Sequence, residues 1–254
     1  MNDYQTLRVK ADAVIATLTL DRPDSRNALN LRMCDELVQA LQALAANESV
    51  RVVLIRANGS VFCAGADLKE RQTMTTEELR ARRLKGFAAY SAIQSMPKPT
   101  IALVHGAAIG SGCEIAGACD FILASSAASF RYPEVGWGTV GATQRLPRIV
   151  GARMAKELLF TGRKVDAEEA RQLGIVNHVV PTDALEGVAL AMAEAIAKSS
   201  PLAVRLTKRC VDDGLETTRD GALAIELEAI DEKLHGSDWK AAIAGFGSAK
   251  DSDR

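Results

Sequence analysis

Two glutamates in this sequence follow residues that impose an unusual backbone path. Glu114 comes after Gly110-Ser111-Gly112-Cys113, at the end of an apolar run predicted to be a strand, Thr100 to Val104. A strand-to-helix turn at these glycines would aim backbone N–H groups into one small volume, and Glu114 would open the helix. Glu134 follows Pro133, which lacks an N–H, at the end of a strand-like run from Ser129 to Tyr132. The pair indicates acid/base chemistry beside a backbone site that stabilises an anion.

Both glutamates have apolar neighbours in the sequence, Cys113 and Ile115 for the first and Pro133 and Val135 for the second. Burial would raise the pKa of a carboxyl group toward neutrality. Two carboxyl groups that share a water molecule could then divide the roles of base and acid. The other glutamates lack such surroundings, and we expect them to be solvated.

A second loop that contains glycine, Ala64-Gly65-Ala66-Asp67, follows the buried run Val52 to Ile55. Such loops at strand ends are where α/β sheets place ligands. Each loop alone is equally typical of a tight turn, and Gly110-Ser111-Gly112 lacks both the third glycine of a dinucleotide fingerprint and the Gly-Lys-Ser/Thr of a phosphate loop. Two such loops together predict convergent N–H groups, which a thioester carbonyl needs when its oxygen takes up negative charge.

Hydrophobic periodicity predicts one α/β core followed by a helical extension. A strand over Val14 to Leu20, a helix from Asn30 to Asn47 and the buried strand Val52 to Ile55 form a β-α-β unit. After Arg145 strands become scarce, and the apolar faces of the last helices have no further sheet to cover. We therefore expect these helices to pack on another subunit. Further strands are predicted over 100–104, 121–124 and 175–180, and further helices from 76 and over 166–174, 185–198, 201–211, 218–235 and 238–246.

The overall composition is ordinary for a globular protein of 254 residues with a formal net charge of −1. That balance gives no long-range reason to expect nucleic acid or an anionic membrane as a partner. No apolar run approaches the roughly 20 residues of a membrane span, and the N-terminus lacks a basic region followed by an apolar one, so we expect a cytoplasmic protein. A basic helical turn with Arg80, Arg82, Arg83 and Lys85 could meet a phosphate, but a solvated helix face is the simpler interpretation.

The five cysteines and three histidines suggest no further chemistry. The cysteine count is odd and no C-x-x-C occurs, so neither a disulfide framework nor a zinc site is predicted. His105, His178 and His235 have no serine or cysteine at the spacing of a nucleophile elbow, and we interpret them as structural or surface residues. Nothing in the sequence requires a metal.

Four motifs in order resemble the enoyl-CoA hydratase/isomerase (crotonase) family, and the resemblance covers nearly the whole chain. It implies a crotonase-like α/β spiral of β-β-α units over residues 1–184. It also implies a helical C-terminal trimerisation region over 185–254, usually assembled as a hexamer of two trimers. The motifs are Asp24-Ser25-Arg26-Asn27-Ala28-Leu29, Phe62-Cys63-Ala64-Gly65-Ala66-Asp67-Leu68, Gly110-Ser111-Gly112-Cys113-Glu114 and Tyr132-Pro133-Glu134, followed by Thr143-Gln144-Arg145-Leu146-Pro147.

By this resemblance Ala66 and Ser111 supply the backbone N–H groups of a thioester oxyanion hole. Glu114 and Glu134 match the two hydratase glutamates: Glu134 protonates C2, and Glu114 helps to activate the water. No cofactor is implied beyond the coenzyme A that the substrate carries. The residues that resemble substrate or CoA contacts are Asp24, Arg26, Ala28, Ala64, Gly65, Asp67, Leu68, Gly110, Phe246 and Lys250.

One segment departs from the family pattern. The loop from Val135 to Ala142 is shorter than the Pro-Gly-containing loop of the standard hydratases, and it carries Trp137. Because that loop borders the acyl pocket in the family, we expect it to reshape the pocket and to influence the placement of Glu134.

The resemblance therefore predicts hydration of a 2-enoyl-CoA thioester to the 3-hydroxyacyl-CoA, as one step of fatty acid β-oxidation. An enoyl-CoA isomerase is an alternative, since isomerisation needs a single proton-shuttling glutamate. A hydrolase or decarboxylase of a special acyl-CoA would use the same oxyanion hole. A noncatalytic acyl-CoA or RNA binder is the remaining alternative, and the near-neutral charge and the two glutamates speak against it.

Overall fold

The computed structural model describes residues 3–235, and the chain divides into two compact units, the first ending at Ile196 and the second starting at Ala197. The helix α8 (Leu185–Ala197), which the sequence groups with the C-terminal region, thus belongs almost entirely to the first unit. The helix predicted over 238–246 and the predicted contacts Phe246 and Lys250 lie outside the described residues.

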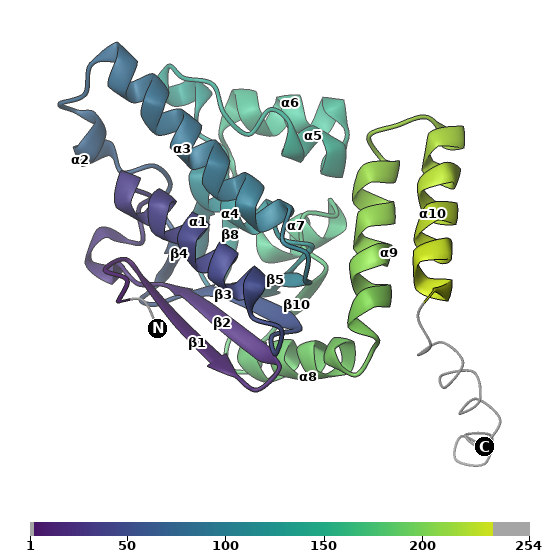
Figure 1. The fold of residues 1–254 in the computed structure, drawn as a ribbon. Helices are drawn as coiled ribbons and strands as arrows, with labels where there is room; N and C mark the ends of the chain where they lie inside the picture. The colour runs from purple at the N-terminus through teal and green to yellow at the C-terminus, as the bar shows by residue number, and fades with distance from the viewer. Residues whose placement is uncertain (1–2, 236–254) are drawn as a thin grey trace. The chain divides into compact units, whose positions relative to one another are not determined.

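The first unit contains a six-stranded sheet with the order β1-β2-β3-β5-β7-β10 (Figure 1). The hairpin β1-β2 is antiparallel and the remaining pairs are parallel. The central strands are short apolar runs buried along nearly their whole length, as expected for parallel strands covered on both faces. The strands are β1 (Leu7–Asp12), β2 (Ile15–Leu20), β3 (Val52–Ala57), β5 (Thr100–Val104), β7 (Phe121–Ser125) and β10 (His178–Val180).

A second sheet has the order β4-β6-β8-β9, with β4 (Val61–Cys63), β6 (Ala107–Ile109) and β8 (Ser129–Arg131) parallel and β9 (Lys164–Asp166) antiparallel to β8. The chain alternates between the sheets, because β3 leads to β4, β5 to β6 and β7 to β8 before a helix begins. This is the β-β-α spiral that the resemblance implies. Since β4, β6 and β8 are parallel neighbours, their carboxyl ends share one edge, and the loops that follow them must meet there.

Two long helices of the first unit pack on one another, α1 (Leu31–Ala46) and α3 (Thr76–Gln94) (Figure 1). Asn30 caps α1, as predicted, by accepting a hydrogen bond from the Met33 N–H. A capping box of Thr75 and Glu78 begins α3, an arrangement that contributes about 1 kcal/mol to helix stability. Asp67 caps the short helix α2 (Leu68–Arg71) that precedes α3.

The short helical turn η1 follows β2 of the first sheet, and α4, η2, α5, α6 and α7 come after strands of the second sheet. The 3₁₀ turn η2 begins directly after Glu134. Asp166 caps α7 through the Glu169 N–H, as predicted. These elements are η1 (Pro23–Ser25), α4 (Ser111–Gly117), η2 (Val135–Trp137), α5 (Arg145–Val150), α6 (Ala152–Thr161) and α7 (Ala167–Gln172).

Several details differ from the sequence expectation. The helix α4 begins at Ser111 rather than at Glu114, because Gly110 adopts a φ of +50° and reverses the chain one turn earlier. The strand β10 covers only the last three residues of its predicted run, and Ile175 is buried in the preceding turn instead. The strands β1, β4, β6 and β9 were not predicted, since charged residues alternate with apolar ones in β1 and the other three strands have only three residues each.

The second unit consists of α9 (Pro201–Gly214) and α10 (Arg219–Leu234), which pack on one another and are joined by ion pairs of Arg205 and Arg209 with Glu232. Along α10, Leu223, Leu227 and Ile230 are 51%, 62% and 47% exposed, and Leu234 continues the same face. No single helix among residues 3–235 is long and apolar enough to cross a membrane; α8 and α9 pass that test only as a bent pair.

Candidate active site

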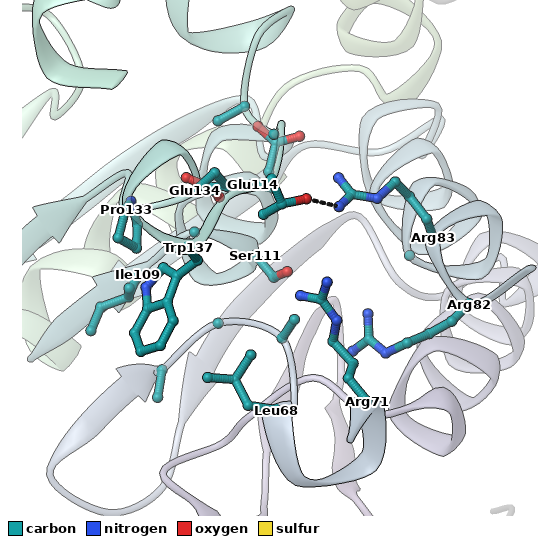
Figure 2. Close-up of a pocket in the computed structure, with 18 of the residues that line it drawn as sticks. Leu68, Arg71, Arg82, Arg83, Ile109, Ser111, Glu114, Pro133, Glu134 and Trp137 are labelled. Atoms are coloured by element: carbon teal, nitrogen blue, oxygen red, sulfur yellow. Dashed lines mark hydrogen bonds between the residues drawn. The ribbon is translucent and has the colours of Figure 1, made fainter. Parts of the chain in front are cut away.

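A cavity of about 770 Å³ lies where the loops after β4, β6 and β8 meet, with α2 and α3 on its other side (Figure 2). This volume falls in the usual range for small-molecule sites. Both predicted glutamates and both predicted oxyanion residues line it, namely Glu114, Glu134, Ala66 and Ser111. The sheet order explains this convergence, since three segments far apart in the sequence end at one sheet edge.

The two glycine loops are in contact through Gly65. Its φ is +97°, and a Cβ placed on it would lie 3.0 Å from the Ile109 carbonyl oxygen and 4.0 Å from the Ser111 nitrogen. The N–H groups of Ala66 and Ser111 donate no hydrogen bond to any residue that the structure describes. For Ser111 the reason is its position as the first residue of α4, where the N–H has no intrahelical acceptor. Two free donors on adjoining loops are what an oxyanion hole requires.

Gly112 allows α4 to approach β4. A Cβ at this position would lie 2.4 Å from the Cys63 carbonyl oxygen and 2.9 Å from the Cys63 Cβ, so any side chain would push the helix away. The close approach holds the Ser111 N–H beside the loop of Ala66. Glycine is thus required here by packing, while its neighbour Gly110 is required by backbone conformation.

Glu114 is held by an arginine from a distant part of the sequence. Nη1 of Arg145 lies 2.9 Å from Oε2 of Glu114, whose side chain is 12% exposed. Arg145 also donates to Oε1 of Gln94 at 2.7 Å and lies over the Tyr90 ring. Burial raises the pKa of Glu114, and the charge of Arg145 opposes this effect only in part. The ion pair orients the carboxylate and favours its ionised form.

Glu134 has a different environment, because no cation of residues 3–235 forms an ion pair with it. A Cβ on Gly110 would lie 2.8 Å from its Oε1, and a Cβ on Gly141 would lie 2.8 Å from its Cγ, so two glycines make room for this side chain. Its Oε2 is buried without a hydrogen-bond partner. Burial raises the pKa of Glu134, the charge of Glu114 adds to the rise, and Arg83 and a hydrogen bond to its own backbone lower it. Such a carboxyl group is suited to carry a proton.

The short loop after Glu134 is attached to α3. Arg83 donates hydrogen bonds to Oγ1 of Thr139, at 2.9 Å, and to the carbonyl oxygen of Val140. Trp137 lines the cavity although its side chain is 67% exposed. The loop therefore forms one wall of the cavity, as expected, and its position depends on an arginine 56 residues before Thr139 in the sequence.

A model of the enoyl-CoA hydratase/isomerase family matches residues 10–252 of this chain. The chain belongs to this family. A short-chain-enoyl-CoA hydratase of Clostridium acetobutylicum is 38% identical over 242 residues, which cover 94% of this chain and 93% of that protein. A crotonyl-CoA hydratase of Syntrophomonas wolfei is 37% identical over 247 residues, which cover 96% and 95%.

The crystal structure of an enoyl-CoA hydratase from Bacillus anthracis superposes with a TM-score of 0.93 at 35% identity, and the match covers 96% of each chain. The crotonase-like fold that the sequence resemblance implies is therefore confirmed, as is membership of the enoyl-CoA hydratase/isomerase family.

The predicted substrate contacts of this family member fall into two groups. Asp24, Ala28 and Asp67 are outside the cavity lining, and Asp67 caps α2 and forms an ion pair with Arg22 at 3.0 Å. The loop of Asp24 nevertheless adjoins the cavity, because the Arg26 carbonyl oxygen accepts a hydrogen bond from the Ala64 N–H at 3.0 Å. The contacts that do line the cavity are Arg26, Ala64, Gly65, Leu68 and Gly110.

Several residues of the site were not singled out from the sequence. Arg145 appeared only as part of a motif, and neither Gly141 nor Arg71 gave a local signal. The solvated face expected for the basic turn of α3 is wrong for Arg82, which is buried and pairs with Glu70 at 3.1 Å. Its partner lies 12 residues away, so helical spacing could not reveal the pair. Among residues 3–235 no cluster of three His, Cys, Asp or Glu side chains could hold a metal ion.

Proposed function

We propose that this chain is an enoyl-CoA hydratase that adds water across the 2,3 double bond of an enoyl-CoA thioester. The observation that carries the proposal is the buried, unpartnered Oε2 of Glu134, in the same cavity as Glu114 and the two free N–H groups. The reaction needs both an acid and a base, and the cavity has two carboxyl groups in different environments. The related hydratases of Clostridium and Syntrophomonas support a short enoyl-CoA as substrate.

In this proposal the thioester carbonyl lies between the N–H groups of Ala66 and Ser111. Both donors are fixed by the backbone, so they need no reorganisation when the oxygen becomes an enolate. A water molecule bound between the two glutamates then attacks C3. Glu114, whose carboxylate Arg145 orients, takes a proton from that water, and Glu134 delivers a proton to C2. The products are the 3-hydroxyacyl-CoA and glutamates that exchange one proton to restore the starting state.

One observation favours isomerisation of a 3-enoyl-CoA as a second candidate. Glu114 is engaged by Arg145, whereas Glu134 has a buried oxygen without a partner among the described residues, and a single glutamate suffices to move a proton between two carbon atoms of the acyl chain. Hydrolysis or decarboxylation of a special acyl-CoA would use the same donors. Neither has an observation in its favour beyond the shared oxyanion hole.

The proposal is tested by a panel of CoA thioesters: short, long, branched and aromatic 2-enoyl-CoAs, together with one 3-enoyl-CoA. We expect loss of the conjugated thioester absorbance with short 2-enoyl-CoAs and a 3-hydroxyacyl-CoA product by mass spectrometry. Conversion of only the 3-enoyl-CoA would instead support the isomerase. Release of free CoA without a change in the double bond would support hydrolysis and contradict both.

We also propose that the chain acts as a homo-oligomer, either a trimer or a dimer of trimers. Support comes from the apolar stripe of Leu223, Leu227, Ile230 and Leu234 on α10, because a stripe of this kind is usually covered by a partner. The double substitution Leu223→Asp and Leu227→Asp is expected to reduce the mass in light scattering toward the 27.1 kDa of a single chain. Circular dichroism reports whether α10 persists. A monomeric wild-type protein would contradict the proposal.

A further inference from the structure

Three arginines on α2 and α3 form a cluster on one wall of the cavity: Arg71, Arg82 and Arg83. Figure 2 shows Arg71 extending toward the space beside Ser111, with the other two next to it. None of the three was expected from the sequence to line the site. This arginine cluster faces the wall that carries Glu114 and Glu134.

The positive charge of the arginine cluster is only partly compensated. Arg82 pairs with Glu70 and donates to the Leu29 carbonyl oxygen. Arg83 binds only neutral groups, the Thr139 hydroxyl and the Val140 carbonyl oxygen. The guanidinium group of Arg71 has no ion pair or hydrogen bond with any residue in the described part of the chain, and only its backbone is hydrogen-bonded, within α2 and the turn that follows. Two guanidinium charges thus lack an acidic partner at one end of a cavity.

The position of Arg71 is electrostatically unfavourable. It is half-buried, and burial together with the charges of Arg82 and Arg83 lowers its pKa. Partly buried charges that lack a partner of opposite charge are expected at functional sites, where a bound ligand supplies the missing charge.

The phosphates of coenzyme A are one source of negative charge, but other arginines of the cavity suit them better. Arg26 and Arg80 line the cavity and are exposed, so they can meet hydrated phosphates at its opening. Arg71 is less exposed than either of these arginines. It belongs to the arginine cluster, in which the charge of Arg83 interacts with Glu134. Its anion should therefore belong to the acyl part of the substrate.

We propose that the acyl chain of the preferred substrate ends in a carboxylate and that Arg71 binds this group. The inference rests on the proposed function, since it requires an acyl-CoA in this cavity. A guanidinium group matches a carboxylate with two parallel hydrogen bonds, and the charge of Arg83 adds to the attraction. The substrate class is thus a 2-enoyl-CoA with a terminal carboxylate, of which the five-carbon pent-2-enedioyl-CoA is the simplest probe.

Binding of unreactive saturated thioesters tests the inference without turnover. Titration calorimetry should show that the wild type binds glutaryl-CoA about 10–100-fold more tightly than pentanoyl-CoA, which has the same chain length and no carboxylate. Arg71→Met should bring this ratio close to one, and Arg71→Lys should keep part of it. Arg153→Met, which removes an exposed arginine outside the cavity, should leave the ratio at its wild-type value.

Three outcomes overturn the inference: no preference for glutaryl-CoA in the wild type, an unchanged ratio in Arg71→Met, or equal weakening of both ligands, which would assign Arg71 to the phosphates. Turnover separates this inference from the proposed function. Hydration of pent-2-enoyl-CoA without any preference for pent-2-enedioyl-CoA would support the hydratase assignment. The same result would refute the proposal that the substrate ends in a carboxylate. A binding preference without hydration of either thioester would refute the hydratase alone.

Discussion

Replacing Glu134 by glutamine is expected to lower kcat for hydration by about 10²–10⁴-fold, the usual contribution of a positioned acid or base. The amide keeps the size of the side chain but cannot deliver a proton to C2. Because the reacting groups and not the CoA contacts are changed, KM should move far less than kcat. Steady-state assays with a short 2-enoyl-CoA measure both constants.

The stability of the variants shows whether the loss is chemical. Burial raises the pKa of Glu134, so the folded state disfavours its ionised form, and Glu134→Gln should unfold at the same or a higher temperature at neutral pH. Glu114→Gln should lose activity as well, but it should also lower the unfolding temperature, because Arg145 loses its counter-charge. The exposed Glu48→Gln is the matched control. Hydratase activity at the wild-type level in both Glu114→Gln and Glu134→Gln would refute the assignment of these roles.

Ser111→Pro is expected to lower kcat by about 10²–10³-fold, because proline removes the N–H that is proposed to bind the thioester oxygen. The substitution is compatible with the fold, since Ser111 is the first residue of α4 and its N–H has no intrahelical acceptor. Proline is well tolerated at this position of a helix. The variant thus deletes a backbone donor with little change elsewhere.

Ser111→Ala is the control, because it keeps the N–H and removes only the hydroxyl, which interacts with Tyr90. Its kcat should stay within a few-fold of the wild type. If Ser111→Ala and Ser111→Pro lose activity equally, the hydroxyl and not the backbone donor would be the important group. Thermal unfolding of both variants checks that α4 is intact.

Local patterns determined most of the secondary structure and the main catalytic candidates. Asn30, Asp166 and Ser200 marked helix starts because a capping side chain acts within one turn. Buried strands such as Thr100–Val104 were evident because parallel strands covered on both faces are continuous apolar runs. Glu114 and Glu134 were singled out because glycine and proline next to them restrict the backbone locally.

Other features depended on contacts between distant segments, which no local pattern carries. Because β4, β6 and β8 are parallel neighbours, the loops of Ala66, Ser111 and Glu134 meet at one cavity. The partner of Glu114 is Arg145, 31 residues later, and the partner of Arg82 is Glu70 on another helix.

The sequence by itself thus identified the family, the two glutamates and the glycine loops, because motifs and backbone preferences depend on residues that are close together in the sequence. Only the tertiary structure showed the different environments of the two glutamates, since one has a cation beside it and the other a buried oxygen without a partner among the described residues. It alone also showed Arg71 facing the cavity without a partner, because charge compensation depends on which distant side chains come within a few ångströms.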